Sequence, residues 1–262
     1  MISGIGATRA SAASEIQIRR FAAEPAADMM LYCFPFAGGS ASFYHPWTSL
    51  MPDGVVVRAL HLPGRPESMD SPSFTSLPAM AGAAAAAISS DAGDTPFVLF
   101  GHSMGALVAF ETTCELERSR RRMPRLLAVS GSSAPHVRSE TPALHLLPDG
   151  EFTAAVGRLG GMPQQIVANT EIMELVLPAL RSDFQMLHRY RFLQRPLLET
   201  PVSVFGGTED PAAPQAALGA WAELTRAAAK VSTYPGGHFF LSAHMAEMLV
   251  ELQADPAWPG RR

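Results

Sequence analysis

The sequence predicts an α/β fold in which helices cover both faces of a mostly parallel central sheet. Short apolar segments alternate along the chain with longer stretches of helical character, and this alternation is typical of parallel sheets. Two apolar segments, 55–57 and 126–129, are uninterrupted, as expected for strands buried on both faces. Strands are predicted near residues 29–35, 55–60, 97–101, 126–131, 201–206 and 231–235.

Length and composition indicate one globular domain. The chain has 262 residues, of which 47% are hydrophobic and 17% charged, as is ordinary for an α/β protein. We expect a flexible N-terminal extension at 1–28, the domain at 29–255 and a loose tail at 256–262, whose prolines cannot continue a helix. The chain shows neither the apolar segment of a secretory signal nor a run long enough to span a membrane, so we expect a cytoplasmic protein.

Charge and cysteine content argue against two other classes of protein. The formal net charge of −4 gives no general reason to bind nucleic acid. The basic cluster at 118–122 is interpreted as a solvated helix end, with a partner-binding patch as the weaker alternative. Cys33 and Cys114 are expected to be small core residues rather than the framework of a disulfide-rich protein.

The segment around Ser103 predicts a nucleophile. The pentapeptide GHSMG at 101–105 follows the apolar run 97–100 and precedes a helix-forming stretch. A serine between two glycines at a strand-to-helix reversal is the nucleophile elbow, in which the glycines permit close packing and the serine is held in a strained conformation. This motif, in this context, predicts the α/β-hydrolase fold.

A serine hydroxyl is a weak nucleophile at neutral pH, so Ser103 requires a histidine base and a carboxylate that orients the histidine. In this fold the acid and then the histidine follow the nucleophile along the chain. Asp210 and His238 occur in that order, each just beyond a predicted strand and a pair of glycines. We therefore predict a catalytic triad of Ser103, Asp210 and His238. Glu209 stays open as the acid, although the shorter carboxylate is the commoner partner.

Two backbone N–H groups are expected to bind the oxyanion that forms during acyl transfer. One belongs to the residue after the nucleophile, which is Met104. The other is expected from the loop after the first predicted strand, within 34–40, where Ala37 is our choice and Phe36 the alternative. Without the elbow, the same loop would be interpreted as a simple glycine turn.

The alternation of strand and helix fails between about 143 and 198. A helical section of about 55 residues replaces a short connection there, and insertions of this length are usually functional. We expect a helical lid above Ser103. Most of its apolar side chains are expected to pack, and the rest to line a hydrophobic acyl tunnel in which methionines adapt to different chains.

The chain resembles the type II thioesterases, the discrete editing enzymes of polyketide synthases and nonribosomal peptide synthetases. The matching segments cover most of the chain: FPFAGGS at 34–40, LPGR at 62–65, FGHSMGA at 100–106, LGGMP at 159–163, LPALRSD at 177–183, GGTED at 206–210 and GGHFF at 236–240. The segments with Arg65 and with Arg181 and Asp183 are more discriminating than the elbow. The family commonly has a second arginine after Arg65, where this chain has Pro66, so no role of that arginine is carried over.

The resemblance implies hydrolysis of aberrant or stalled acyl groups from the phosphopantetheine arm of acyl or peptidyl carrier proteins, through an acyl-Ser103 intermediate. It implies a monomer whose partners are carrier domains rather than nucleic acid or membranes. No metal and no cofactor of its own is expected, because the phosphopantetheine belongs to the partner. Two alternatives stay open: a general carboxylesterase or lipase, which the triad permits equally, and a catalytically idle module that binds carrier proteins.

Overall fold

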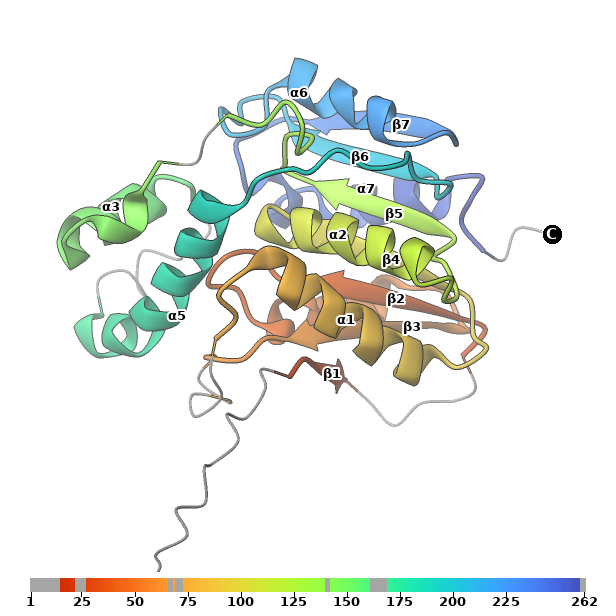
Figure 1. Cartoon of the computed structure of the whole chain (residues 1–262), viewed down its shortest axis with the longest axis horizontal. Coiled ribbons are helices and arrows are strands. Elements are labelled where there is room, and N and C mark those ends of the chain that lie inside the picture. Colours follow the sequence, from red (N-terminus) through yellow and green to blue (C-terminus); the bar gives the residue numbers. More distant parts are fainter. Residues whose placement is uncertain are drawn as a thin grey trace, which may run out of the picture.

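A seven-stranded sheet forms the centre of the protein, with helices on both of its faces (Figure 1). The computed structural model describes residues 15–21, 27–65, 68, 73–139, 142–160 and 169–259. The strands lie in the order β1-β3-β2-β4-β5-β6-β7, and every neighbouring pair is parallel except β1 with β3. The predicted mostly parallel sheet between helical layers is therefore confirmed.

Each strand predicted from the sequence is present within a few residues of its expected bounds. The strands are β1 (Gln17–Arg20), β2 (Met29–Phe34), β3 (Val55–His61), β4 (Phe97–His102), β5 (Leu126–Ser130), β6 (Val202–Gly207) and β7 (Ala229–Tyr234). The α-helices are α1 (Leu77–Ala92), α2 (Met104–Arg118), α3 (Asp149–Gly157), α5 (Thr170–Arg189), α6 (Gln215–Gly219) and α7 (Met245–Gln253). Short 3₁₀ helices are η1 (Ala41–Leu50), η3 (Leu144–Leu146), η4 (Ala220–Leu224) and η5 (Phe240–Ser242).

The two faces of the sheet bury two separate hydrophobic clusters. Successive side chains of a strand point to opposite faces, so Tyr32 and Leu99 pack beneath α1 and α2 while Leu31 and Phe100 pack against η1 and α7. Figure 1 shows α1 and α2 in front of the sheet and α7 behind it. Burial on both faces explains why the central strands are uninterrupted apolar runs.

The expected flexible extension contains a strand that the sequence analysis missed. Residues Gln17–Arg20 form β1, which pairs antiparallel with β3 at the sheet edge. Most of its side chains are exposed, and charged residues are common on edge strands, where they discourage further pairing. Such a short polar strand has no apolar run by which it could be predicted. The rest of the expected extension lies outside the described residues, apart from 15, 16, 21, 27 and 28.

The expected loose tail is also partly ordered against the core. Trp258 is only 6% exposed and joins the cluster beneath α7. The chain reaches that position through a turn at Asp255, whose carboxylate accepts hydrogen bonds from Ser203 Oγ at 2.5 Å and from Ala257 N at 2.9 Å. Prolines do prevent a helix here, but burial of the indole fixes the segment without one. Residues 260–262 lie outside the described part of the chain.

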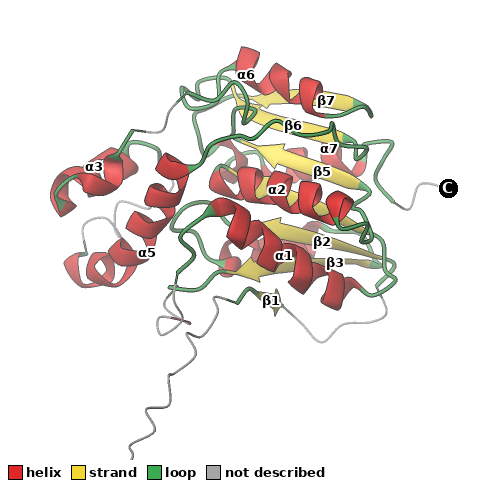
Figure 2. Ribbon diagram, viewed as in Figure 1, coloured by secondary structure: helices red, strands yellow, loops and turns green. Residues whose placement is uncertain are grey.

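The helices of the expected lid, α3 and α5, lie between β5 and β6 in the chain and stand at one end of the sheet (Figure 2). The side chain of Asn169 begins α5 by accepting a hydrogen bond from Ile172 N at 3.1 Å. The lid has a small cluster of its own, formed by Phe152, Val156, Leu180 and Phe184. Residues 140–141 and 161–168 of this region, including Met162 and Pro163, lie outside the described part.

None of the helices in the described residues combines the length and the apolar character that crossing a membrane requires.

Candidate active site

Ser103 lies at the junction of β4 and α2 in a conformation that few side-chain-bearing residues adopt. Its φ is 55° and its ψ is −116°. A Cβ atom at Gly105 would collide with the backbone of Phe34, and one at Gly101 with the backbone of Gly105. The two glycines therefore allow α2 to approach β4 and β2 closely, and Ser103 is held at the end of the strand. Such backbone strain persists only where the surrounding packing fixes it.

The structure brings the three predicted residues into one hydrogen-bonded chain. Ser103 Oγ lies 2.9 Å from His238 Nε2, and His238 Nδ1 lies 2.7 Å from Asp210 Oδ2. A carboxylate only accepts hydrogen bonds, so Nδ1 carries the proton and Nε2 is left to accept the proton of the serine hydroxyl. Asp210 and His238 are 3% and 8% exposed, which leaves little competition from water.

The acid and the histidine are positioned by adjacent loops at the ends of β6 and β7. Two backbone hydrogen bonds tie these loops together, from Thr208 N to Tyr234 O and from Glu209 N to Gly236 O, both at 2.9 Å. The second oxygen of Asp210 accepts from Ala212 N at 2.9 Å, which fixes the plane of the carboxylate. Glu209, the alternative acid, has an exposed side chain, so it is Asp210 that contacts the histidine.

His102, the second residue of the pentapeptide, packs beside the ring of His238. Its Nδ1 is 3.0 Å from Ser130 Oγ, and its ring centroid is 5.1 Å from that of His238. Complete burial, and then the neighbouring His238, hold the pKa of His102 well below its usual value. His102 therefore stays neutral and acts as packing beneath His238.

The two predicted donors of the oxyanion hole lie on the loop after β2, at Ala37, and at the start of α2, at Met104. Gly39 N donates to Phe36 O at 2.8 Å, which closes a tight turn with Ala37 at its second position beside the cavity. Met104 is the first residue of α2, and an N–H in the first turn of a helix has no acceptor within the helix. The helix dipole also favours negative charge at that end. Phe36, the alternative donor, contributes its ring to the cavity wall.

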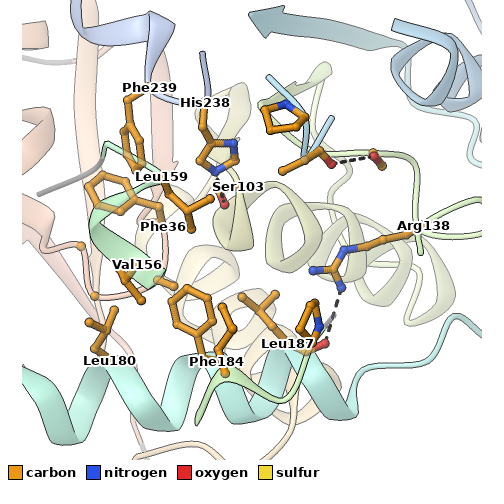
Figure 3. A pocket seen from close by; sticks show the side chains of 18 of the residues that line it. Phe36, Ser103, Arg138, Val156, Leu159, Leu180, Phe184, Leu187, His238 and Phe239 are labelled. Atoms are coloured by element: carbon orange, nitrogen blue, oxygen red, sulfur yellow. Dashed lines mark hydrogen bonds between the residues drawn. The ribbon is translucent and has the colours of Figure 1, made fainter. Parts of the chain in front are cut away.

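A cavity of about 790 Å³ separates the lid from Ser103 and His238. In Figure 3, Leu180, Phe184 and Leu187 lie on α5 and face the cavity opposite the serine and histidine. Further apolar walls come from the loops of the sheet: Phe36, Phe43 and Phe239. Such a mostly apolar cavity with a few polar groups is typical of a small-molecule site and suits an acyl chain.

One expectation about the cavity is wrong. No methionine is among its lining residues in the described part of the chain. Met173 and Met186 are instead buried, and the larger apolar side chains of the cavity wall are aromatic or branched aliphatic. The sequence of α5 shows which residues are apolar, but it does not show which of them face the cavity.

The cavity wall also holds a charged group that no sequence pattern predicted. Arg138, on the loop after β5, is half-buried and donates to Leu187 O at 3.5 Å. Burial, the larger effect, lowers the pKa of its guanidinium. No local motif distinguishes this arginine from a surface one. Among the described residues, no group of three or more His, Cys, Asp or Glu side chains is arranged to hold a metal ion.

Comparison with known proteins gives a consistent result. The model of the thioesterase domain family matches residues 29–255. The chain is 35% identical over 224 residues to the gramicidin S biosynthesis protein GrsT of Aneurinibacillus migulanus, with 86% of this chain and 87% of the relative covered. Among solved structures, the RedJ thioesterase of the prodiginine pathway of Streptomyces coelicolor has a TM-score of 0.82 and 34% identity, with 89% of each chain covered. The type II thioesterase BorB of the borrelidin cluster has a TM-score of 0.81 and 32% identity, with 89% of this chain and 96% of that chain covered.

Proposed function

Because this chain belongs to the thioesterase domain family, we propose that it is a type II editing enzyme, which hydrolyses aberrant or stalled acyl groups from the phosphopantetheine arm of carrier proteins. Family membership makes the chain a thioester hydrolase. The carrier-bound substrate and the editing role are the proposal. They are supported by the relatives and neighbours named for gramicidin S, prodiginine and borrelidin biosynthesis, all of which match over most of this chain.

In the first half of the proposed reaction, Ser103 Oγ attacks the thioester carbonyl while His238 Nε2 takes its proton. Asp210 keeps the imidazole oriented and stabilises the positive charge that develops on it. The N–H groups of Met104 and Ala37 bind the oxyanion of the tetrahedral intermediate. Collapse of that intermediate breaks the C–S bond, and His238 returns the proton to the departing thiolate, which leaves an acyl-Ser103 ester.

In the second half, water takes the place of the thiol. His238 Nε2 removes a proton from the water as it attacks the acyl-serine carbonyl, and the same two N–H groups bind the new oxyanion. Breakdown releases the carboxylic acid and restores the Ser103 hydroxyl. Every catalytic group in these two half-reactions belongs to the protein or is water, and the phosphopantetheine enters as part of the substrate.

The observation that carries the proposal is the chain of hydrogen bonds from Ser103 through His238 to Asp210 at the edge of an apolar cavity of about 790 Å³. The direct test is intact-mass monitoring of carrier proteins loaded with acetyl, propionyl, butyryl and longer acyl groups. We expect the acyl mass to disappear with the wild-type protein and to persist with Ser103→Ala. Equal loss of the acyl mass with both proteins would refute the proposed mechanism.

A general carboxylesterase or lipase is the less favoured alternative. The relative turnover of matched thioesters and oxygen esters separates the two activities, since an esterase would cleave the oxygen esters and leave acyl-carriers intact. An idle binding module is separated by a phosphonate probe, which must label Ser103 if the site is active. Carrier domains as partners, a monomeric state and a cytoplasmic location remain predictions.

A further inference from the structure

A buried ion pair joins the lid to the loop after β2. Asp183, on α5, accepts a hydrogen bond from Arg65 Nη2 at 2.6 Å and another from Gly38 N at 2.8 Å, both on Oδ2. Arg65 Nε in turn donates to Gly39 O at 2.9 Å. The two charged side chains are 3% and 4% exposed. Two consecutive residues of the loop are thus bound by an acid from the lid and a base from the loop after β3.

Apolar packing brings the same turn of α5 onto the same loop. Gly38 has a φ of +73°, and a Cβ atom there would lie 2.5 Å from Leu180 Cδ1. Leu180 and Asp183 are three residues apart and lie on one face of the helix. Ala179 packs beside the loop after β3, within 3.8 Å of the position of a Cβ atom on Gly64. The middle of α5 is therefore in contact with both loops.

Packing alone does not explain the charges at this contact. Burying an ion pair costs desolvation energy, and well-packed hydrophobic residues of similar volume often stabilise a protein as well or better. A carboxylate and a guanidinium do offer something that apolar side chains lack, which is directional hydrogen bonding to backbone N–H and C=O groups. Here one end of that network is the N–H of the peptide that joins Ala37 to Gly38, and the other is the carbonyl of Gly39, two residues after Ala37.

We propose that Asp183 is a positioning residue that orients the oxyanion-binding N–H of Ala37 by holding Gly38, and that Arg65 holds Asp183 in place. The lid helix is then part of the catalytic geometry and not only a wall of the cavity. Displacement of this turn of α5 weakens oxyanion binding, so an acyl chain that fits beneath the lid is hydrolysed faster than one that pushes α5 away. This inference rests on the proposed oxyanion role of Ala37.

The test compares variants on p-nitrophenyl butyrate, an ester that needs the oxyanion site but no carrier protein. Asp183→Asn keeps an acceptor for Gly38 N but leaves Arg65 without its counter-ion. The double variant Arg65→Met with Asp183→Leu removes both charges, which avoids an unpaired buried ion and preserves folding. The control is Arg181→Met, which removes a cation of the same helix. Its partners are Asp149 at 2.5 Å, the carbonyl of His145 and the ring of Phe152, all of them within the lid.

Three quantities are measured for each variant: kcat and KM, the fraction of sites titrated by a fluorophosphonate, and the inhibition constant of a trifluoromethyl ketone. The ketone forms a tetrahedral adduct with the serine and so mimics the transition state. We expect Asp183→Asn and the double variant to lower kcat by about 10-fold to 100-fold, less than the loss of an oxyanion donor itself, with KM changed by less than about threefold. The inhibition constant rises by the same factor as kcat falls, and the control stays near the wild type.

The inference is overturned if the folded double variant keeps the wild-type kcat and inhibition constant. It is also overturned if kcat falls only in proportion to the titrated sites while the inhibition constant stays constant, because that is the behaviour of a purely structural contact. Failure of the carrier assay leaves these measurements unaffected, since the reporter ester does not involve a carrier. The two hypotheses can therefore fail separately.

Discussion

The strand ends that carry the catalytic residues and the lid face each other across the cavity, and they are held in place by different contacts. The catalytic residues follow strands of the central seven-stranded sheet: Ser103, Asp210 and His238. Hydrogen bonds join these strands to their neighbours, and a large hydrophobic cluster packs against each face of the sheet. The lid's own cluster has four buried residues among those described, and α5 exposes Leu175 to 49%. The catalytic groups thus lie on the part of the molecule with more buried contacts, and the walls that we expect to select the acyl chain lie on the part with fewer.

This comparison predicts unequal consequences of substitution. Substitution of a catalytic residue at the strand ends should abolish turnover of every acyl group. A change in the lid should alter which acyl group is preferred and leave the chemistry intact. The contact of Asp183 with the loop at Gly38 is the exception, because it connects the two regions.

The largest effect is expected at the nucleophile. Ser103→Ala should lower kcat by about 10⁶-fold for every acyl group tested, because the variant lacks the attacking oxygen and therefore cannot form the acyl-enzyme. Steady-state hydrolysis of a series of acyl thioesters measures this, with the melting temperature as the control for folding. A loss of kcat for only some of the acyl groups would contradict the assignment of Ser103 as the nucleophile.

The next effect separates two neighbouring carboxylates. Asp210→Asn should lower kcat by about 10⁴-fold, because the amide no longer holds the tautomer of His238 that can accept the serine proton. Glu209→Gln is the matched control, since the side chain of Glu209 is exposed, and it should retain activity close to that of the wild type. Comparable losses in both variants would show that the acid has been assigned to the wrong residue.

The lid prediction concerns selectivity. Phe184 is 6% exposed, lines the cavity and packs against Phe152 at a ring distance of 5.5 Å. Phe184→Ala should raise kcat/KM for long acyl groups relative to butyryl by about tenfold, because the cavity is enlarged. Competition between acyl-carriers of different length measures the ratio. Leu175→Ala, on the exposed side of the same helix, should leave the ratio unchanged; a shift there would mean that α5 acts through its overall stability.

The smallest effect tests the stability of the sheet side against pH. Burial alone would raise the pKa of Glu251, but hydrogen bonds from Lys230, Ser232 and Tyr234 lower it from 4.5 to about 2. A carboxyl whose folded pKa is lowered stabilises the fold above its unfolded pKa, and that contribution is lost as the pH falls from about 4.5 to about 2. Discounted for its partial exposure, Glu251→Gln should cost about 1 kcal/mol at pH 7 and nothing near pH 2. Urea unfolding of both proteins across this range measures the difference, and one that persisted at pH 2 would point to packing instead.

Local sequence was sufficient for the parts of the site that depend on neighbouring residues. The elbow is a pattern of five residues: its close packing follows from the glycines two positions before and after the serine, and its strain lies at the serine itself. The acid and base were predictable because parallel strands end at the same edge of a sheet, so residues just beyond different strands come together. The central strands were predictable because burial on both faces requires uninterrupted apolar runs.

Tertiary structure alone decided the features that depend on residues far apart in the chain. Arg65 and Asp183 are separated by 118 positions, and only the docking of α5 shows that they pair. The strand at Gln17–Arg20 exists because β3 offers a free edge, and Trp258 is ordered because a space beneath α7 accepts its ring. Local propensity carries no information about such partners, since the free energy of each contact arises only once the two segments have been brought together.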